Sequence, residues 1–103
     1  MKTIQEVEAE IRDAVQTARD AGLVLTRGIT NDGERCCLLG AFAPEEQTDF
    51  VDELLPSFEE RWGCTESDLM DLIAGFDGTP YEGSEWSALG ARLARELEAE
   101  EPC

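Results

Sequence analysis

The feature that most constrains the fold is a run of apolar residues at helical spacing near the N-terminus. Its members recur at steps of three and four residues: Ile4, Val7, Ile11, Ala14, Val15 and Ala18. This period places them on one face of an α-helix, and that face must be buried against another element. Thr3 and Glu6 have the spacing of a capping box, and Gly22 is a natural stop. We therefore predict a helix over residues 3–21.

The next segment has the composition of β-strands. Residues 23–30 are rich in aliphatic and β-branched side chains, and residues 34–39 are again largely apolar. Between them lies Asn31-Asp32-Gly33, a turn signal because an Asp-Gly pair suits positive φ angles. The pattern predicts a β-hairpin. Because two strands alone are only marginally stable, this hairpin must lie on the helices.

Short helices are predicted for the rest of the chain. Pro44 suits the first position of a helix, Pro56 would interrupt it so that it restarts there, and Gly63 would end it. Thr65 or Ser67 would then cap a helix with an apolar face, formed by Leu69, Leu72, Ile73 and Phe76.

The sequence after that helix predicts a loop, one more helix and a frayed end. Residues 75–80 read as a glycine-rich loop, and residues 98–103 as a frayed tail. Ser84 would cap the last helix. The inward residues of that helix are Trp86, Leu89, Leu93 and Leu97.

These elements predict one small domain over residues 1–103, of α+β class and mostly α. Its order would be an N-terminal helix, one β-hairpin and three or four short helices around a single core. The predicted core is Val7, Ile11, Leu23, Leu25, Leu38, Phe42, Val51, Leu54, Phe58, Trp62, Leu69, Leu72, Ile73, Trp86, Leu89 and Leu93.

The charge of the chain is extreme and unevenly distributed. The formal net charge is −16 over 103 residues, and residues 45–71 alone hold ten acids against the single base Arg61. Direct binding to nucleic acid or to an anionic membrane is disfavoured because like charges repel. A cationic protein partner is favoured. The alternative is a surface that only keeps the chain soluble, although a small domain needs a net charge of only about 2–8 in magnitude for that.

The composition argues against several kinds of catalysis. The chain has no histidine and only one lysine, Lys2, and it lacks the phosphate-binding and nucleophile-elbow motifs. We therefore expect a protein that is not an enzyme and that needs no cofactor. No apolar run approaches the roughly 18 residues of a membrane helix, and the N-terminus lacks a signal-peptide core, so we expect it in the cytoplasm.

Cysteines and acids could in principle hold a metal. Cys36 and Cys37 are adjacent, and neighbouring side chains of a strand point to opposite faces, so they, Cys64 and Cys103 do not have the spacing of a zinc site. We expect one of the adjacent pair to be packed and the other partly exposed. Asp77 lies near Glu82 and Glu85, but the calcium-loop order is missing. A hydrogen bond from Asp77 to the backbone of its own turn is the simpler expectation.

Residues 23–95 resemble a pattern of small uncharacterised bacterial and phage proteins. The segments that carry the resemblance are the Cys-Cys-x-Leu-Gly-Ala run at 36–41, the Gly-Phe-Asp-Gly run at 75–78 and the Leu-Gly-x-x-Leu run at 89–93. The resemblance implies a fold and no activity. Gly40 and Gly90 would permit close approach of two backbones, and Gly75 and Gly78 a tight loop.

The acidic stretch provides the leading hypothesis for function. Acids three or four residues apart on a helix lie about 5–6 Å from each other, a spacing comparable to that of phosphates along a nucleic-acid strand. In composition the chain resembles acidic inhibitors such as anti-CRISPR proteins, anti-restriction DNA mimics and immunity proteins. We predict that it docks on a basic, nucleic-acid-binding protein and blocks it, with Tyr81 or Trp86 as an aromatic anchor. The predicted contacts are Glu45, Glu46, Asp49, Asp52, Glu53, Glu59, Glu60, Glu66 and Asp68.

Two other classes of function stay open from the sequence. One is a cytosolic thiol module in which Cys36 and Cys37 respond to metal or redox conditions. The other is a structural subunit of a phage particle or of a larger complex. The sequence leaves the identity of the partner and the oligomeric state open.

Overall fold

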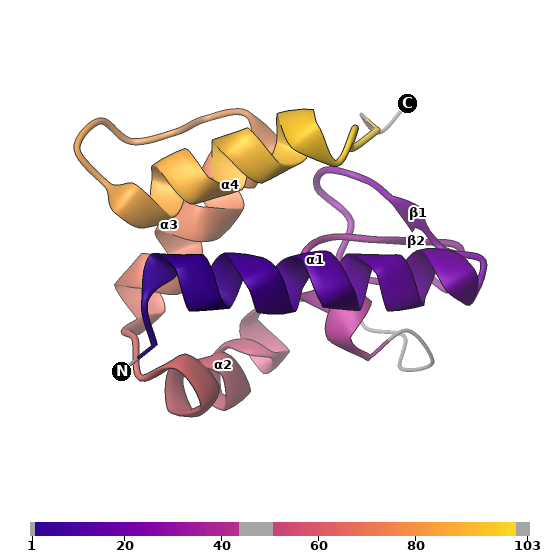
Figure 1. The fold of residues 1–103 in the computed structure, drawn as a ribbon, viewed down its shortest axis with the longest axis horizontal. Coiled ribbons are helices and arrows are strands. Elements are labelled where there is room, and N and C mark those ends of the chain that lie inside the picture. The colour runs from indigo at the N-terminus through magenta and orange to yellow at the C-terminus, as the bar shows by residue number, and fades with distance from the viewer. Residues whose placement is uncertain (1, 44–50, 101–103) are drawn as a thin grey trace.

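The computed structural model describes residues 2–43 and 51–100, with the side chain of Val51 left out. The fold class is confirmed: the chain is mostly helical with one small two-stranded sheet. The elements, in order, are helix α1 (Ile4–Asp20), strands β1 (Val24–Leu25) and β2 (Arg35–Cys36), the 3₁₀ turns η1 (Gly40–Phe42) and η2 (Val51–Glu53), and helices α2 (Leu55–Trp62), α3 (Glu66–Asp77) and α4 (Glu85–Glu96). Helix α1 crosses the molecule, with α4 along one side of it and α2 along the other (Figure 1).

Helix α1 forms as the sequence predicts. The hydroxyl of Thr3 accepts a hydrogen bond from the Glu6 backbone N–H at 3.2 Å, and the Glu6 carboxylate accepts one from the Thr3 N–H at 3.2 Å. This reciprocal capping box satisfies two backbone donors at the start of the helix. The face that α1 buries consists of Val7, Ile11, Val15 and Ala18.

The predicted β-hairpin is wrong, because β1 and β2 pair in parallel. Val24 is opposite Arg35 and Leu25 is opposite Cys36. The turn signal itself is real: the side chain of Asn31 accepts from the Gly33 N–H at 2.9 Å, and Asn31 forms an antiparallel bridge with Cys36. The chain has therefore already reversed once between β1 and Asn31. Two reversals bring β2 back beside β1 in the same direction.

The C-terminal segment extends this small sheet. The Arg27 N–H donates to the carbonyl of Glu100 at 2.8 Å, and the Glu100 N–H donates to the carbonyl of Leu25 at 2.9 Å. Residues 98–100 were expected to fray, but these two bonds hold Glu100 against the end of β1. The last three residues, 101–103, lie outside the described part of the chain.

The helix restart predicted at Pro56 is confirmed. Helix α2 begins at Leu55 with Pro56 in its first turn, where the missing N–H costs nothing, and it ends at Gly63 with φ of 65°. Thr65 caps α3, and its hydroxyl accepts from the Asp68 N–H at 3.2 Å. The predicted helix start at Pro44 lies outside the described residues.

The predicted loop over residues 75–80 is wrong for its first three residues, which belong to α3. Gly78, with φ of 102°, ends the helix. Gly75 instead lets α3 pack closely on α4: a Cβ there would lie 1.9 Å from the carbonyl oxygen of Ser87. A Cβ on Gly90 would lie 2.0 Å from the carbonyl oxygen of Leu72. The role predicted for Gly90 is confirmed, and Gly75 shares it.

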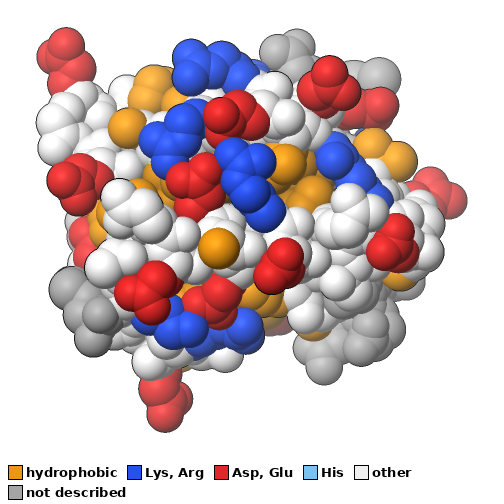
Figure 2. Space-filling model, viewed as in Figure 1, with side chains coloured by type: hydrophobic (Ala, Val, Ile, Leu, Met, Phe, Trp, Pro, Cys, Tyr) orange, Lys and Arg blue, Asp and Glu red, His pale blue; other side chains and the backbone are white. Residues whose placement is uncertain are grey.

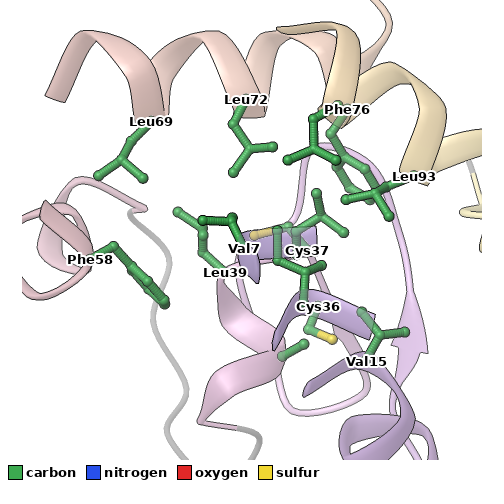
Figure 3. Close-up of a cluster of buried hydrophobic side chains, with 14 of the residues drawn as sticks. Val7, Val15, Cys36, Cys37, Leu39, Phe58, Leu69, Leu72, Phe76 and Leu93 are labelled. Atoms are coloured by element: carbon green, nitrogen blue, oxygen red, sulfur yellow. The ribbon is translucent and has the colours of Figure 1, made fainter. Parts of the chain in front are cut away.

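One apolar core joins all the helices (Figure 3). Most of the predicted core is buried, while Phe42, Leu54, Ile73 and Trp86 are only partly buried against it. The prediction for Val51 falls on a side chain that the structure does not describe. The aromatic part of the core includes a contact between Phe58 and Trp62, with ring centroids 4.8 Å apart. The prediction left out several buried residues: Val15, Ala18, Cys36, Cys37, Leu39, Leu55 and Phe76.

Candidate interaction surface

Six of the nine predicted contact acids lie in the described part of the chain. They come in three pairs along the segment from η2 to α3: Asp52 and Glu53 in η2, Glu59 and Glu60 in the last turn of α2, and Glu66 and Asp68 in the first turn of α3. Glu59 and Asp68 are half-buried and the other four are exposed. The remaining three predicted contacts, Glu45, Glu46 and Asp49, lie outside the described residues. We call residues 51–71 the acidic segment.

Two carboxylates of the acidic segment help to build the fold. That of Asp68 accepts from the Thr65 N–H at 3.2 Å and completes the capping box of α3. That of Asp71 accepts from the hydroxyl of Ser84 at 2.9 Å, which links α3 to the start of α4. Negative charge in the first turn of a helix is also favoured by the helix dipole. Part of the acidity of this segment is therefore structural.

The acids of α2 do not have a structural role of this kind. Glu59 and Glu60 lie in the last turn of the helix, where the dipole disfavours negative charge. Burial raises the pKa of the Cys64 thiol, and the charges of Asp68 and Glu59 raise it further. Carboxylates from α2 and α3 thus both act on the turn that joins these helices.

The single base of the acidic segment is directed away from these acids. The Arg61 Nε donates to the Glu10 carboxylate of α1 at 2.8 Å, and its guanidinium lies 4.8 Å from the centre of the Phe42 ring. Glu10 also accepts a hydrogen bond from Lys2. Burial raises the pKa of Glu10, but the hydrogen bonds from Lys2 and Arg61 outweigh it and leave that pKa lowered.

The surface shared by α1 and α4 has a different distribution of charge. Arg12 contacts Glu8 at 2.8 Å and Glu96 at 2.6 Å, and Arg92 contacts Glu8 at 2.6 Å. Basic and acidic side chains alternate on the face that contains these helices (Figure 2). The hydrogen bond from Arg12 lowers the pKa of Glu8; burial opposes this, and Arg92 adds to it. The sequence contains a signal for this network in the four-residue spacings Glu8–Arg12 and Arg92–Glu96.

The cysteines of the described region are buried. Cys36, Cys37 and Cys64 are free thiols with exposures of 1%, 6% and 8%. The expectation that one of the adjacent pair is partly exposed is wrong, because the whole run 36–41 is enclosed by the fold. Burial raises the pKa of Cys36 to about 11, so its reactive thiolate is scarce at neutral pH. Cys103 lies beyond the described residues.

Asp77 has a different hydrogen-bond partner from the one predicted. Its carboxylate accepts from the Gly28 N–H at 3.0 Å, so it ties the end of α3 to the segment after β1 rather than to its own turn. Burial raises the pKa of Asp77, while the Gly28 bond and Arg27 oppose this rise. Across residues 2–43 and 51–100, no three or more cysteines and acids cluster in a way that could hold a metal ion.

The two predicted aromatic anchors differ in exposure. Tyr81, in the connection from α3 to α4, is 61% exposed. Trp86 is partly buried, and its ring centroid lies 6.1 Å from that of Trp62. Tyr81 is therefore the better placed of the two to contact a partner.

Comparison with known proteins returns no family model, no curated protein and no solved structure that matches the chain. The resemblance to small bacterial and phage proteins therefore stays a prediction. Among the residues that the structure describes, none of the helices has the length and apolar character required to cross a membrane.

Proposed function

We propose that this chain is a non-enzymatic binding protein that uses its acidic segment to dock on a basic surface of another protein. The partner class we favour is a nucleic-acid-binding protein in the cytoplasm, whose basic groove the carboxylates would occupy in place of phosphates. The bound partner would thereby be blocked, as in anti-CRISPR, anti-restriction and immunity proteins, which the chain resembles in composition.

The observation that carries the proposal is the placement of Arg61. The acidic segment contains seven carboxylates and this one base, and the base is bonded to Glu10 of α1. Asp68 and Asp71 serve the fold, but the segment still holds a large excess of carboxylates over bases. Such an excess attracts a cationic partner over a distance set by the Debye length, about 10 Å at 0.1 M salt.

Position within the helices supports the same interpretation. Glu59 and Glu60 lie at the end of α2, where the helix dipole makes negative charge unfavourable by about 0.3–1 kcal/mol per residue at low ionic strength. A surface that served solubility alone would gain as much from acids placed elsewhere or interspersed with lysines. We infer that these positions are acidic because a partner requires them.

Displacement from DNA tests the proposal. Proteins from a lysate of the cells that carry this sequence are loaded on immobilised double-stranded DNA and eluted with the purified chain at low ionic strength. We expect the wild-type chain to release a defined subset of the bound proteins, and the release to fall as salt is raised, since the interaction is electrostatic.

A pair of variants with equal net charge makes this experiment specific. The test variant neutralises three exposed acids of the segment, by Asp52→Asn, Glu60→Gln and Glu66→Gln. The control variant neutralises three exposed acids outside it, by Asp13→Asn, Asp20→Asn and Glu34→Gln. The proposal predicts that the test variant releases several-fold less protein than the control variant. Equal release by the two variants, or release that does not depend on salt, contradicts it.

A further inference from the structure

A surface hollow lies beside the acidic segment, at the connection between α3 and α4. It has a volume of about 460 Å³. Its lining residues are Pro80, Tyr81, Glu82, Gly83, Ser84, Glu85 and Ala88. Pro80, Tyr81 and Ala88 are apolar members of this lining, and Glu82 and Glu85 are its acidic members. The hollow thus combines an aromatic face with negative charge.

The backbone around this hollow is held in place. The Tyr81 N–H donates to the hydroxyl of the fully buried Ser87 at 2.7 Å, and the carbonyl of Tyr81 accepts from the Ser84 N–H at 3.4 Å. Gly83 has a φ of 80°, a conformation that suits glycine, and it lets the chain turn into α4. The hollow is therefore formed before any partner arrives, which reduces the entropy lost on binding.

The tyrosine ring remains in water although its backbone is fixed. Tyr81 is 61% exposed, the highest value among the large hydrophobic side chains that the structure describes. Single exposed apolar residues are common and need no explanation. Here, however, the ring lines a hollow together with the exposed acids Glu82 and Glu85, and none of the residues that line this hollow is basic. An aromatic face next to two carboxylates is complementary to a flat organic cation.

The hollow adjoins one end of the acidic segment, at Asp71. The hydroxyl of Ser84, one of its lining residues, donates to the carboxylate of Asp71 in α3 at 2.9 Å. The last acid of the segment therefore lies at the rim of the hollow. A partner that contacts Asp71 could therefore also contact Tyr81, while α2 lies on the other side of α1 from α4 (Figure 1).

We propose that the hollow receives an arginine side chain of the cationic partner. The guanidinium would stack on the Tyr81 ring and donate hydrogen bonds to Glu82 or Glu85. Arginine suits such a site better than lysine, because its planar group stacks on aromatic faces and bonds to a carboxylate through two N–H groups. This inference rests on the proposed function and adds the residue through which the partner is anchored.

The experiment compares oligoarginine and oligolysine peptides of equal length, with binding measured by calorimetry at low ionic strength. Both peptides carry the same charge, so attraction to the acidic segment is common to them. We expect the wild-type chain to bind the arginine peptide about threefold to tenfold more tightly, the range expected for stacking at an exposed site with a paired charge.

Variants of the hollow decide whether Tyr81 causes this preference. Tyr81→Ala and the double variant Glu82→Gln with Glu85→Gln are expected to remove it, and Tyr81→Phe to retain it, because the ring face is kept. The matched control is Met70→Ala, which truncates an exposed apolar residue of α3 away from the hollow lining. It should leave the preference for arginine unchanged.

Three results would overturn the inference: equal affinity of the two peptides for the wild-type chain, a preference that survives Tyr81→Ala, and a preference that is lost equally in Met70→Ala. The proposed function is judged separately, by the variant with Asp52→Asn, Glu60→Gln and Glu66→Gln. One outcome is that this variant weakens the binding of both peptides while the hollow variants leave the preference for arginine unchanged. In that case the acidic segment binds cations and only the arginine anchor is wrong. If neither peptide binds the wild-type chain, both ideas fail.

Discussion

The surface of α1 and α4 and the acidic segment use their charges in opposite ways. On the first surface, Arg12 and Arg92 bridge Glu8 and Glu96 and connect two helices that are far apart in sequence. In the acidic segment, the single base Arg61 reaches across to Glu10 of α1. Arg12, Arg61 and Arg92 thus lie where they hold helices together.

The net charge of the chain therefore does not show how the charges of each region are paired. The acids of α1 that pair with arginine have lowered pKa values and stabilise the fold. The acids at the end of α2 oppose the helix dipole and stabilise nothing that the structure describes. The comparison therefore predicts that removing one negative charge has opposite effects on stability in the two regions.

The largest effect is expected at Glu8, because its carboxylate pairs with both Arg12 and Arg92. Glu8→Gln should lower the free energy of unfolding by about 1 kcal/mol, the upper range for surface ion pairs, since two pairs are lost and the side chain is only 21% exposed. Thermal unfolding followed by circular dichroism measures this. Asp13→Asn, on the exposed side of α1, is the control and should change little. A neutral result for Glu8→Gln would remove the distinction between the two regions.

A smaller effect should appear in the pH dependence of the same variant. The folded pKa of Glu8 lies below its ordinary value of 4.5, chiefly because Arg12 donates to it. Its stabilisation is therefore fully present above that pH and is lost as the pH falls through the folded pKa. The difference in unfolding free energy between the wild-type chain and Glu8→Gln should stay constant near neutral pH and shrink in acid. A difference that grows in acid would show that the pairing does not act through the ionised carboxylate.

The smallest effect, and of opposite sign, is expected at the end of α2. Glu60→Gln removes an exposed negative charge from the last turn of the helix, so it should raise the free energy of unfolding by about 0.3–0.5 kcal/mol at low ionic strength. Denaturant titrations at low and high salt measure the change, and the gain should vanish at high salt because the interaction is screened. Destabilisation by Glu60→Gln would show that this acid has a structural role.

Much of the fold can be predicted from the sequence, because local rules determine the helix ends. Thr3, Thr65 and Ser84 cap helices as their residue types predict, and Gly63 and Gly78 end them. The strands could not be predicted to the same degree. The turn at Asn31 can be recognised from the sequence. The earlier reversal, at Gly28 with φ of 77°, is tied to Asp77 and Glu100, and no local pattern encodes these long-range bonds.

The candidate site is only partly predictable for the same reason. The acids of residues 45–71 are evident from composition, but their partners are not. That Asp68 caps a helix follows from its spacing to Thr65, whereas the bond between Asp71 and Ser84 needs the close packing of α3 on α4. Arg61 and its partner Glu10 are 51 residues apart in sequence, so their contact depends wholly on the tertiary fold. Long-range pairing of charges is the part that sequence patterns leave undetermined.

We propose that the acidic segment, and not the surface of α1 and α4, is the region that a cationic partner contacts. The most direct measurement is a titration of the isotope-labelled chain with an oligolysine peptide at low ionic strength, followed by NMR shifts of the backbone amides. The account predicts that, among the described residues, the largest shifts fall between residues 52 and 71 and disappear as salt is raised. Shifts concentrated on α1 and α4, or spread evenly over the chain, would contradict it.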